Sequence, residues 1–129
     1  MWSVMLFRIV HIQHLYPGGW TAITNRPSIT GSPSLIALSL PRFELGQLVV
    51  TAGAAVALRR AGQSPWEFVT RHAAGDWGEV SDHDWHMNDL AVVAGDRVLS
   101  AYTTSEGQRI WVITESGGYS TCILVPAEY

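Results

Sequence analysis

One stretch of the sequence gathers most of the side chains that could carry chemistry. Residues 71–78 read Arg-His-Ala-Ala-Gly-Asp-Trp-Gly, and residues 79–89 add two histidines, three aspartates and an asparagine. Histidine titrates near neutral pH and suits acid–base catalysis, whereas arginine stabilises negative charge that develops in a transition state. A nuclease-like active site is therefore one hypothesis for this stretch.

The nuclease hypothesis assigns His72 as the general acid or base and Arg97 as the clamp on a phosphate group. Ser100, Tyr102 and Thr114 would be polar groups mounted on a sheet beside them. Small barnase-like and RelE-like ribonucleases share a layout of helices followed by a β-meander, which is an analogy of layout alone. The structural alternative is a half-buried histidine at a helix end and an arginine paired with a neighbouring carboxylate.

A metal site is a weaker hypothesis for the same residues. Asp82 and Asp84 stand where carboxylates cap a helix, and Asp76 lies where a turn is expected, so each has a structural explanation. The spacing of His72, these aspartates and His86 matches no metal-binding signature. We therefore expect no metal and no cofactor.

A protein-binding surface around this stretch is the preferred hypothesis. Because the chain is acidic, its tryptophans are expected to be core or interface anchors and not stacking platforms for bases. An acidic helix N-terminus beside a Trp-Gly pair could dock a partner protein. The residues assigned to this surface are Asp76, Trp77, Asp84, Asn88, Thr114 and Glu115.

Composition limits the class of protein. The 129 residues allow one domain, and 47% hydrophobic with 15% charged residues suits a packed core. The net charge of −3 does not favour nucleic acid, which needs clustered lysine and arginine. The apolar start is shorter than the roughly 20 residues that span a membrane. The single cysteine, Cys122, falls in an apolar strand pattern that predicts an inert buried thiol in a reducing cytoplasm.

The first 42 residues differ from the rest of the chain. The apolar start is followed at residues 16–34 by a segment rich in proline, glycine, serine and threonine. Neither helical nor strand periodicity is sustained there. We predict that residues 1–42 are a flexible arm or an upstream extension of the gene model, and that residues 43–129 form the folded domain.

Helices are expected at residues 52–60, 65–72 and 82–94. Each is preceded by a capping hydroxyl side chain and followed by a glycine that suits a helix end. The third helix carries a stripe that is predicted to face the core, formed by His83, Met87, Leu90 and Ala94.

Strands are expected mainly in the last third of the chain. After a short β-like run at 47–50, alternating apolar residues at 97–104, 109–114 and 119–125 are separated by glycine-containing turns. This pattern predicts an α+β domain in which about three short helices are followed by a three- or four-stranded antiparallel β-meander.

These elements also predict where the chemistry-bearing residues meet. Asp84 and Asn88 lie one turn apart on a helix, and Arg97 begins a strand just after that helix ends. The Asp76 carboxylate is expected to accept backbone N–H bonds of its own turn. We expect His72, Asp76, Asp84, Asn88 and Arg97 to converge at one end of the sheet.

Short motifs spread over the predicted domain form a joint pattern. They lie at residues 43–47, 51–54, 71–78, 84–89, 95–102, 110–115 and 124–129. Together they resemble a family of small bacterial proteins carried on plasmids, phages and integrated elements, often labelled plasmid-related or type I restriction–modification proteins. The chain departs from that pattern at residues 116–122, where the family has a turn arginine.

That resemblance implies an accessory protein of a mobile genetic element with a defence or counter-defence role. The restriction–modification label does not fit the residues. No glycine-rich loop joins a strand to a helix, and the domain is too small for a methyltransferase.

Overall fold

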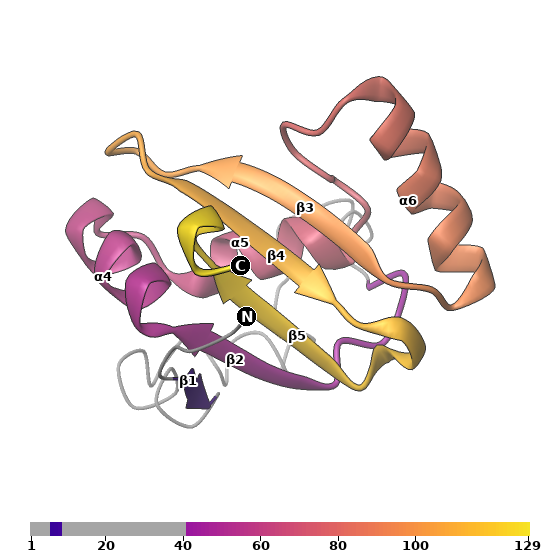
Figure 1. The fold of residues 1–129 in the computed structure, drawn as a ribbon, viewed down its shortest axis with the longest axis horizontal. Coiled ribbons are helices and arrows are strands. Elements are labelled where there is room, and N and C mark those ends of the chain that lie inside the picture. Colours follow the sequence, from indigo (N-terminus) through magenta and orange to yellow (C-terminus); the bar gives the residue numbers. More distant parts are fainter. Residues whose placement is uncertain (1–5, 9–40) are drawn as a thin grey trace, which may run out of the picture.

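The computed structural model describes residues 6–8 and 41–129, which form a mixed sheet with helices around it. The strands are β1 (Leu6–Arg8), β2 (Gln47–Thr51), β3 (Val98–Thr103), β4 (Arg109–Thr114) and β5 (Ser120–Leu124). Their order across the sheet is β1-β2-β5-β4-β3 (Figure 1). The α+β class predicted from the sequence is confirmed.

The helices begin and end where local chemistry favours it. They are α4 (Ala52–Ala61), α5 (Pro65–Ala73) and α6 (Asp82–Ala94), with short 3₁₀ turns η2 (Ser116–Gly118) and η3 (Pro126–Glu128). The Thr51, Ser64 and Ser81 side chains cap the three helices, and α4 and α6 end at glycines in the left-handed conformation. The predicted helix positions are therefore confirmed.

The sheet is mixed and not purely antiparallel as predicted. β3, β4 and β5 form the predicted antiparallel meander, but β2 pairs parallel with β5. The three helices carry the chain from β2 to β3 at the far edge, and the meander then returns so that β5 runs beside β2 in the same direction. The short run at 47–50 contains no local signal for its partner strand, which is why the sequence did not predict this pairing.

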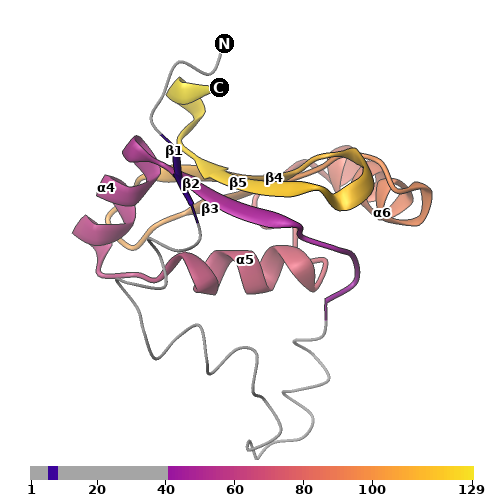
Figure 2. The ribbon, with the colours of Figure 1, turned by 90° about the horizontal axis from the view of Figure 1, so that it is seen from below.

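Both faces of the sheet bury apolar residues. Figure 2 shows α5 crossing one face and η3 on the opposite side, and Figure 1 shows α6 beside the β3 edge. On the helical face the buried core contains Leu48, Val50, Leu58, Phe68, Val69, Tyr102, Ile110, Val112 and Ile123. On the other face Ile113, Cys122 and Leu124 pack together with Trp111, Leu99 and Val49.

The outer edge of β3 is covered by polar contacts. The Trp77 carbonyl accepts the Ala101 N–H at 3.1 Å, and the Glu79 N–H donates to the Ala101 carbonyl at 2.7 Å. Two residues earlier on β3, the Asn88 side chain of α6 bonds both the N–H and the carbonyl of Leu99. An exposed strand edge would present unpaired N–H and C=O groups, so these contacts hold α6 and the turn before it in place.

The α6 stripe predicted to face the core lies on the surface. His83, Met87, Leu90 and Ala94 are all exposed, and Asn88 is the buried residue of this helix. The prediction was wrong because α6 packs beside the edge of the sheet and not on its face. An edge offers backbone polar groups, so the residue that α6 buries against it is the polar Asn88.

The predictions for residues 1–42 fall mostly outside the described residues. Within that range, β1 pairs antiparallel with β2, and Arg42 belongs to the folded domain. Its N–H donates to the Ala73 carbonyl at 2.7 Å, and its guanidinium lies 3.6 Å from Asp89. No helix in the described part of the chain has both the length and the apolar character needed to cross a bilayer.

Candidate functional site

His72 is the centre of a buried chain of hydrogen bonds between α5 and the sheet. Its Nδ1 atom lies 2.6 Å from Ser100 Oγ on β3, and its Nε2 atom lies 2.9 Å from Thr114 Oγ1 on β4. Thr114 Oγ1 lies 2.7 Å from Thr121 Oγ1 on β5, which donates to the Leu45 carbonyl at 2.7 Å. The chain of bonds therefore links one helix to three neighbouring strands.

The last bond of this chain determines the direction of the others. The single hydroxyl hydrogen of Thr121 goes to the Leu45 carbonyl, so Thr114 must donate to Thr121. Thr114 then has no hydrogen for His72 and accepts one from Nε2–H. Burial keeps the imidazole neutral, so it carries a single hydrogen. With that hydrogen on Nε2, Nδ1 accepts from the Ser100 hydroxyl.

Burial also keeps these groups uncharged. The His72 side chain is fully buried, and desolvation lowers its pKa from 6.5 to about 3. Desolvation raises the pKa of the Tyr102 hydroxyl well above its ordinary value and raises the pKa of the Cys122 thiol to about 12. Cys122 is thus the inert buried thiol that its strand pattern predicts.

The residues of the nuclease hypothesis do not form an open active site. His72, Ser100 and Tyr102 are all fully buried. Tyr102 donates its hydroxyl hydrogen to the Asp76 carbonyl at 2.6 Å, which connects β3 to the turn after α5. Among the described residues, no three histidine, cysteine, aspartate or glutamate side chains are grouped so as to hold a metal ion. In this arrangement the three side chains are buried between α5, the turn after it and the sheet.

Asp76 holds the turn after α5, as predicted. Its Oδ1 accepts the Gly78 N–H at 3.1 Å, and its Oδ2 lies 2.6 Å from Arg71 Nε. This hydrogen bond raises the pKa of Arg71, whose guanidinium lies 4.6 Å over the Tyr102 ring. Gly78 has a φ of 73°, and a Cβ there would lie 2.1 Å from the Ala101 carbonyl oxygen. Only glycine fits this close approach to β3.

Trp77 lies inside the domain and not on a docking surface. Its side chain has no exposed area, and its Nε1 donates to Asp89 Oδ1 at 3.0 Å. The indole stacks on the Phe43 ring, with centroids 6.0 Å apart, and meets the edge of His72 at 5.7 Å. The assignment of Trp77 as a partner contact was wrong, because a side chain with no accessible surface cannot touch a partner.

Arg97 lies on the other side of the sheet from His72. Its Nη2 donates to the Tyr129 hydroxyl at 2.6 Å, and its Nε lies 3.6 Å from Glu115 Oε1. The Tyr129 ring packs on Trp111, which alternation along β4 places on the face opposite His72. The predicted convergence of His72 with Arg97 is therefore wrong, and the paired-arginine alternative describes its contacts.

Asp84 and Asn88 are separated as well. Buried Asn88 donates to the Leu99 carbonyl at 2.8 Å and accepts the Leu99 N–H at 3.3 Å. Asp84 is exposed, its N–H bonds the capping Ser81 hydroxyl, and its carboxylate lies 3.4 Å from His83 Nδ1. The two side chains serve the edge of β3 and the start of α6, and not a common site.

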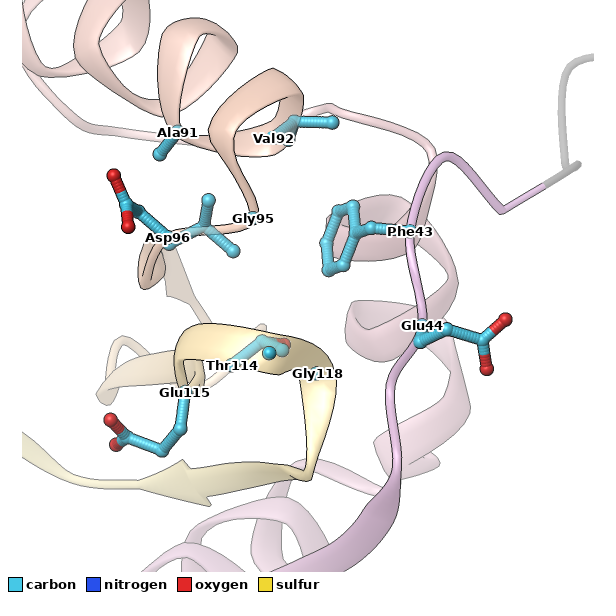
Figure 3. Close-up of a pocket in the computed structure, with 11 residues that line it drawn as sticks. Phe43, Glu44, Ala91, Val92, Gly95, Asp96, Thr114, Glu115 and Gly118 are labelled. Carbon is cyan, nitrogen blue, oxygen red and sulfur yellow. The ribbon is translucent and has the colours of Figure 1, made fainter.

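A pocket of about 200 Å³ opens beside the C-terminal end of α6, between that helix, η2 and the start of the folded domain (Figure 3). It is lined by Phe43, Val92, Val98 and Thr114, with Glu44, Asp96 and Glu115 around it. In Figure 3 the three carboxylates point outward from the rim, so the interior is mainly apolar. Thr114 connects this pocket to the hydrogen bonds of His72.

The solvent side of α6 forms a second surface feature. Met87, Leu90 and Val93 are 48%, 52% and 86% exposed. They recur every three residues and lie on the side of the helix turned away from Asn88 and β3. We call these three residues the α6 outer face. Single exposed apolar residues are common, but three on one side of a helix form a patch.

Sequence analysis did not predict the roles of Thr121 and Phe43. Thr121 is linked to His72 through Thr114 only because β5 pairs with β4 in a register that sets Thr121 opposite Thr114. Phe43 lies outside every helix and strand, yet its ring contacts both His72 and Trp77. Hydroxyl side chains at alternating positions of the strands could have indicated the role of Thr121. Nothing in the sequence indicated the role of Phe43.

Comparison with known proteins yields no relative of this chain. No family model, no curated protein and no solved structure matches it. The family resemblance of the sequence motifs therefore stays a prediction, and function has to be argued from the geometry of the described residues.

Proposed function

We propose that this protein acts by binding a protein partner through the α6 outer face. The observation that supports the proposal is the exposure of Met87, Leu90 and Val93 on one side of a single helix. Burying apolar surface contributes roughly 25 cal/mol per Å², so covering this patch would favour association. An apolar helix face is also one of the recurring surfaces by which proteins recognise partners.

The α6 outer face is presented by a helix that is already fixed. Asn88 fastens the opposite side of α6 to β3, Ser81 caps its start, and Gly95 closes its end. Binding to a preformed surface loses less conformational entropy than binding to a segment that must fold. The arrangement therefore suits a docking surface that is ready before the partner arrives.

Charge around α6 favours a different protein over a second copy of this chain. The first turn of α6 carries Asp82 and Asp84, whereas its last turn carries no basic residue and is followed by Asp96. Two antiparallel α6 helices would bring these carboxylates near the negative end of the partner's helix dipole. A surface with apolar side chains flanked by basic ones would complement α6 at both ends.

The resemblance of the sequence motifs bears on the kind of system to which this partner belongs. It implies an accessory protein of plasmids, phages and integrated elements, and on this basis we propose a partner from a defence or counter-defence system. The net charge of −3 supports a protein partner over nucleic acid. No cofactor is needed for a binding function of this kind.

Site-specific photo-cross-linking tests the proposal. A cross-linking side chain is placed at Val93 or, as the control, at Val56, which is 41% exposed on α4. In cells that naturally carry the gene, a defined adduct should form from position 93 and not from position 56. The captured protein is then purified and its affinity for the full chain is measured.

Matched variants make that measurement decisive. Replacing Leu90 and Val93 together by glutamine should weaken binding at least about tenfold, which corresponds to about 1.4 kcal/mol. Val56→Gln should leave the affinity unchanged, and none of the variants should lower the melting temperature markedly, because all three positions are exposed. Equal affinities of the Leu90/Val93 variant and the wild type would contradict the proposal.

A further inference from the structure

We infer that the pocket beside the C-terminal end of α6 accepts an arginine side chain presented by a partner protein. The inference rests on the proposed function, because a partner covering the α6 outer face would also reach the last turn of α6. That turn supplies Val92 to the pocket and Val93 to the α6 outer face. One bound protein could therefore contact both surfaces.

The size and walls of the pocket suit a single long side chain. Its volume of about 200 Å³ is below the roughly 300–1,000 Å³ of sites that enclose a whole small-molecule ligand. Phe43, Val92 and Val98 give it an apolar interior. Such walls pack well against the aliphatic stem of a cationic side chain, whose charged end then stays at the rim.

The charge at the rim selects a cation. Glu44, Asp96 and Glu115 lie at the rim with their carboxylates turned outward (Figure 3), and only Glu115 has an ion-pair partner among the described residues, Arg97 at 3.6 Å. The C-terminal end of α6 also borders the pocket, and its last turn carries no basic residue. The negative end of this helix dipole is therefore uncompensated within the helix and adds to the attraction for a positive group.

The chemistry of the pocket favours arginine over lysine. A guanidinium is planar, stacks on aromatic rings and offers several N–H donors to carboxylates, whereas an ammonium is a compact point charge. Phe43 supplies a ring at the pocket, and the Thr114 hydroxyl keeps a second lone pair after its bonds to His72 and Thr121.

Two arginines of this protein already lie against an aromatic ring and a carboxylate together. The Arg71 guanidinium lies 4.6 Å over the Tyr102 ring and bonds the Asp76 carboxylate. The Arg97 guanidinium lies 5.3 Å from the centre of the Tyr129 ring and faces Glu115. An aromatic ring beside a carboxylate therefore already holds guanidinium groups in this fold, and the pocket has the Phe43 ring in its wall and carboxylates at its rim.

A peptide titration followed by NMR tests the inference. The full chain, labelled with ¹⁵N, is titrated with N-acetyl-Gly-Arg-Gly-amide and with the same peptide carrying citrulline, which keeps the shape of arginine but lacks its charge. The arginine peptide should shift the amide signals of Val92, Val98 and Gly117, which line the pocket, and should bind at least about tenfold more tightly than the citrulline peptide.

Variants that remove charge show whether the carboxylates at the rim cause the preference for the arginine peptide. Replacing Glu44 by glutamine together with Asp96 by asparagine should weaken the arginine peptide at least about fivefold. The matched control is Glu106→Gln together with Asp82→Asn, because Glu106 is exposed in the β3–β4 turn and Asp82 in the first turn of α6, each at the far end of its element from the pocket. An equal effect of the control variant would overturn the inference, since attraction would then come from overall charge.

Other outcomes separate the remaining possibilities. Equal binding of the arginine and citrulline peptides, or of a lysine peptide and the arginine peptide, would overturn the inference. Tighter binding of free butylguanidinium than of the arginine peptide would also overturn it, because the occupant would then be a small cation. A partner that binds the α6 outer face without any arginine preference would contradict the pocket inference alone. Arginine-peptide binding without a partner at α6 would contradict the proposed function alone.

Discussion

His72 Nδ1 lies 2.6 Å from the Ser100 hydroxyl oxygen, and both side chains are fully buried. The pair has the composition of a base and a nucleophile, and Thr114 and Thr121 fix the histidine proton on Nε2, so Nδ1 accepts from Ser100. Desolvation keeps the imidazole neutral. At the position where the sequence suggested catalysis, the structure has a polar link between α5 and β3.

Acid should destabilise the fold through His72. Its pKa is 6.5 in the unfolded chain and about 3 in the folded protein, so the unfolded state binds the proton first as the pH falls. The stabilising contribution is complete above about pH 6.5 and is lost toward pH 3, by about 1.4 kcal/mol per pH unit within that window. Urea unfolding at several pH values should therefore show a shallower pH dependence for His72→Gln than for the wild type.

Exposed His83 provides the control for this measurement. His83→Gln should keep the pH dependence of the wild type, because the His83 side chain is 79% exposed and is not part of the core. If the unfolding free energy of His72→Gln falls with pH as steeply as that of the wild type, the buried imidazole is not the cause of the loss of stability in acid.

Gly78→Ala should destabilise the protein more than Gly62→Ala does. Both glycines have positive φ values, 73° and 66°, so either alanine is expected to cost about 1–2 kcal/mol of left-handed strain. At Gly78 a Cβ would also meet the Ala101 carbonyl oxygen at 2.1 Å, whereas at Gly62 nothing lies within 4 Å. We expect a further loss of about 2 kcal/mol for Gly78→Ala in chemical denaturation. Equal losses in the two variants would contradict the close pairing of this turn with β3.

Asn88→Ala should loosen α6 from the sheet. The substitution leaves both backbone groups of Leu99 without the amide that they bond, at an expected cost of about 1–3 kcal/mol. Met87→Ala, one residue away and 48% exposed, should change the unfolding free energy by less than about 0.5 kcal/mol. Hydrogen exchange of the Leu99 amide offers a direct readout, and it should quicken in Asn88→Ala alone. Unchanged protection would show that α6 is held by other contacts.

The sequence alone determined the local structure of this chain. Helix starts at Ala52, Pro65 and Asp82 follow from capping side chains that bond backbone N–H groups within a few residues. The Asp76 turn was predictable for the same reason, because its carboxylate bonds the N–H of Gly78 two residues ahead. Interactions of this range are encoded in neighbouring residues.

Tertiary structure decided which elements pair and which sides face inward. The β2 run contains no signal for its parallel partner β5, because strand pairing depends on the path of the intervening chain. Likewise, the spacing of Met87 and Leu90 defines one side of a helix but not whether a core lies there. The Asn88 side of α6 packs against the polar edge of β3, and the apolar side of the helix is therefore exposed to solvent.

The same division holds for the candidate site. The sequence placed His72 on an apolar helix side beside Phe68 and Val69, and the structure buries it fully where a half-buried position was expected. Its bonds to Ser100 and Thr114 required the register of β3 with β4, which sets the two hydroxyls on the helical face. The alternation of strand residues and the distant Tyr129 side chain draw Arg97 to the opposite face. Contacts between residues far apart in the chain depend on the packed fold, so only the tertiary structure could separate the histidine from the arginine.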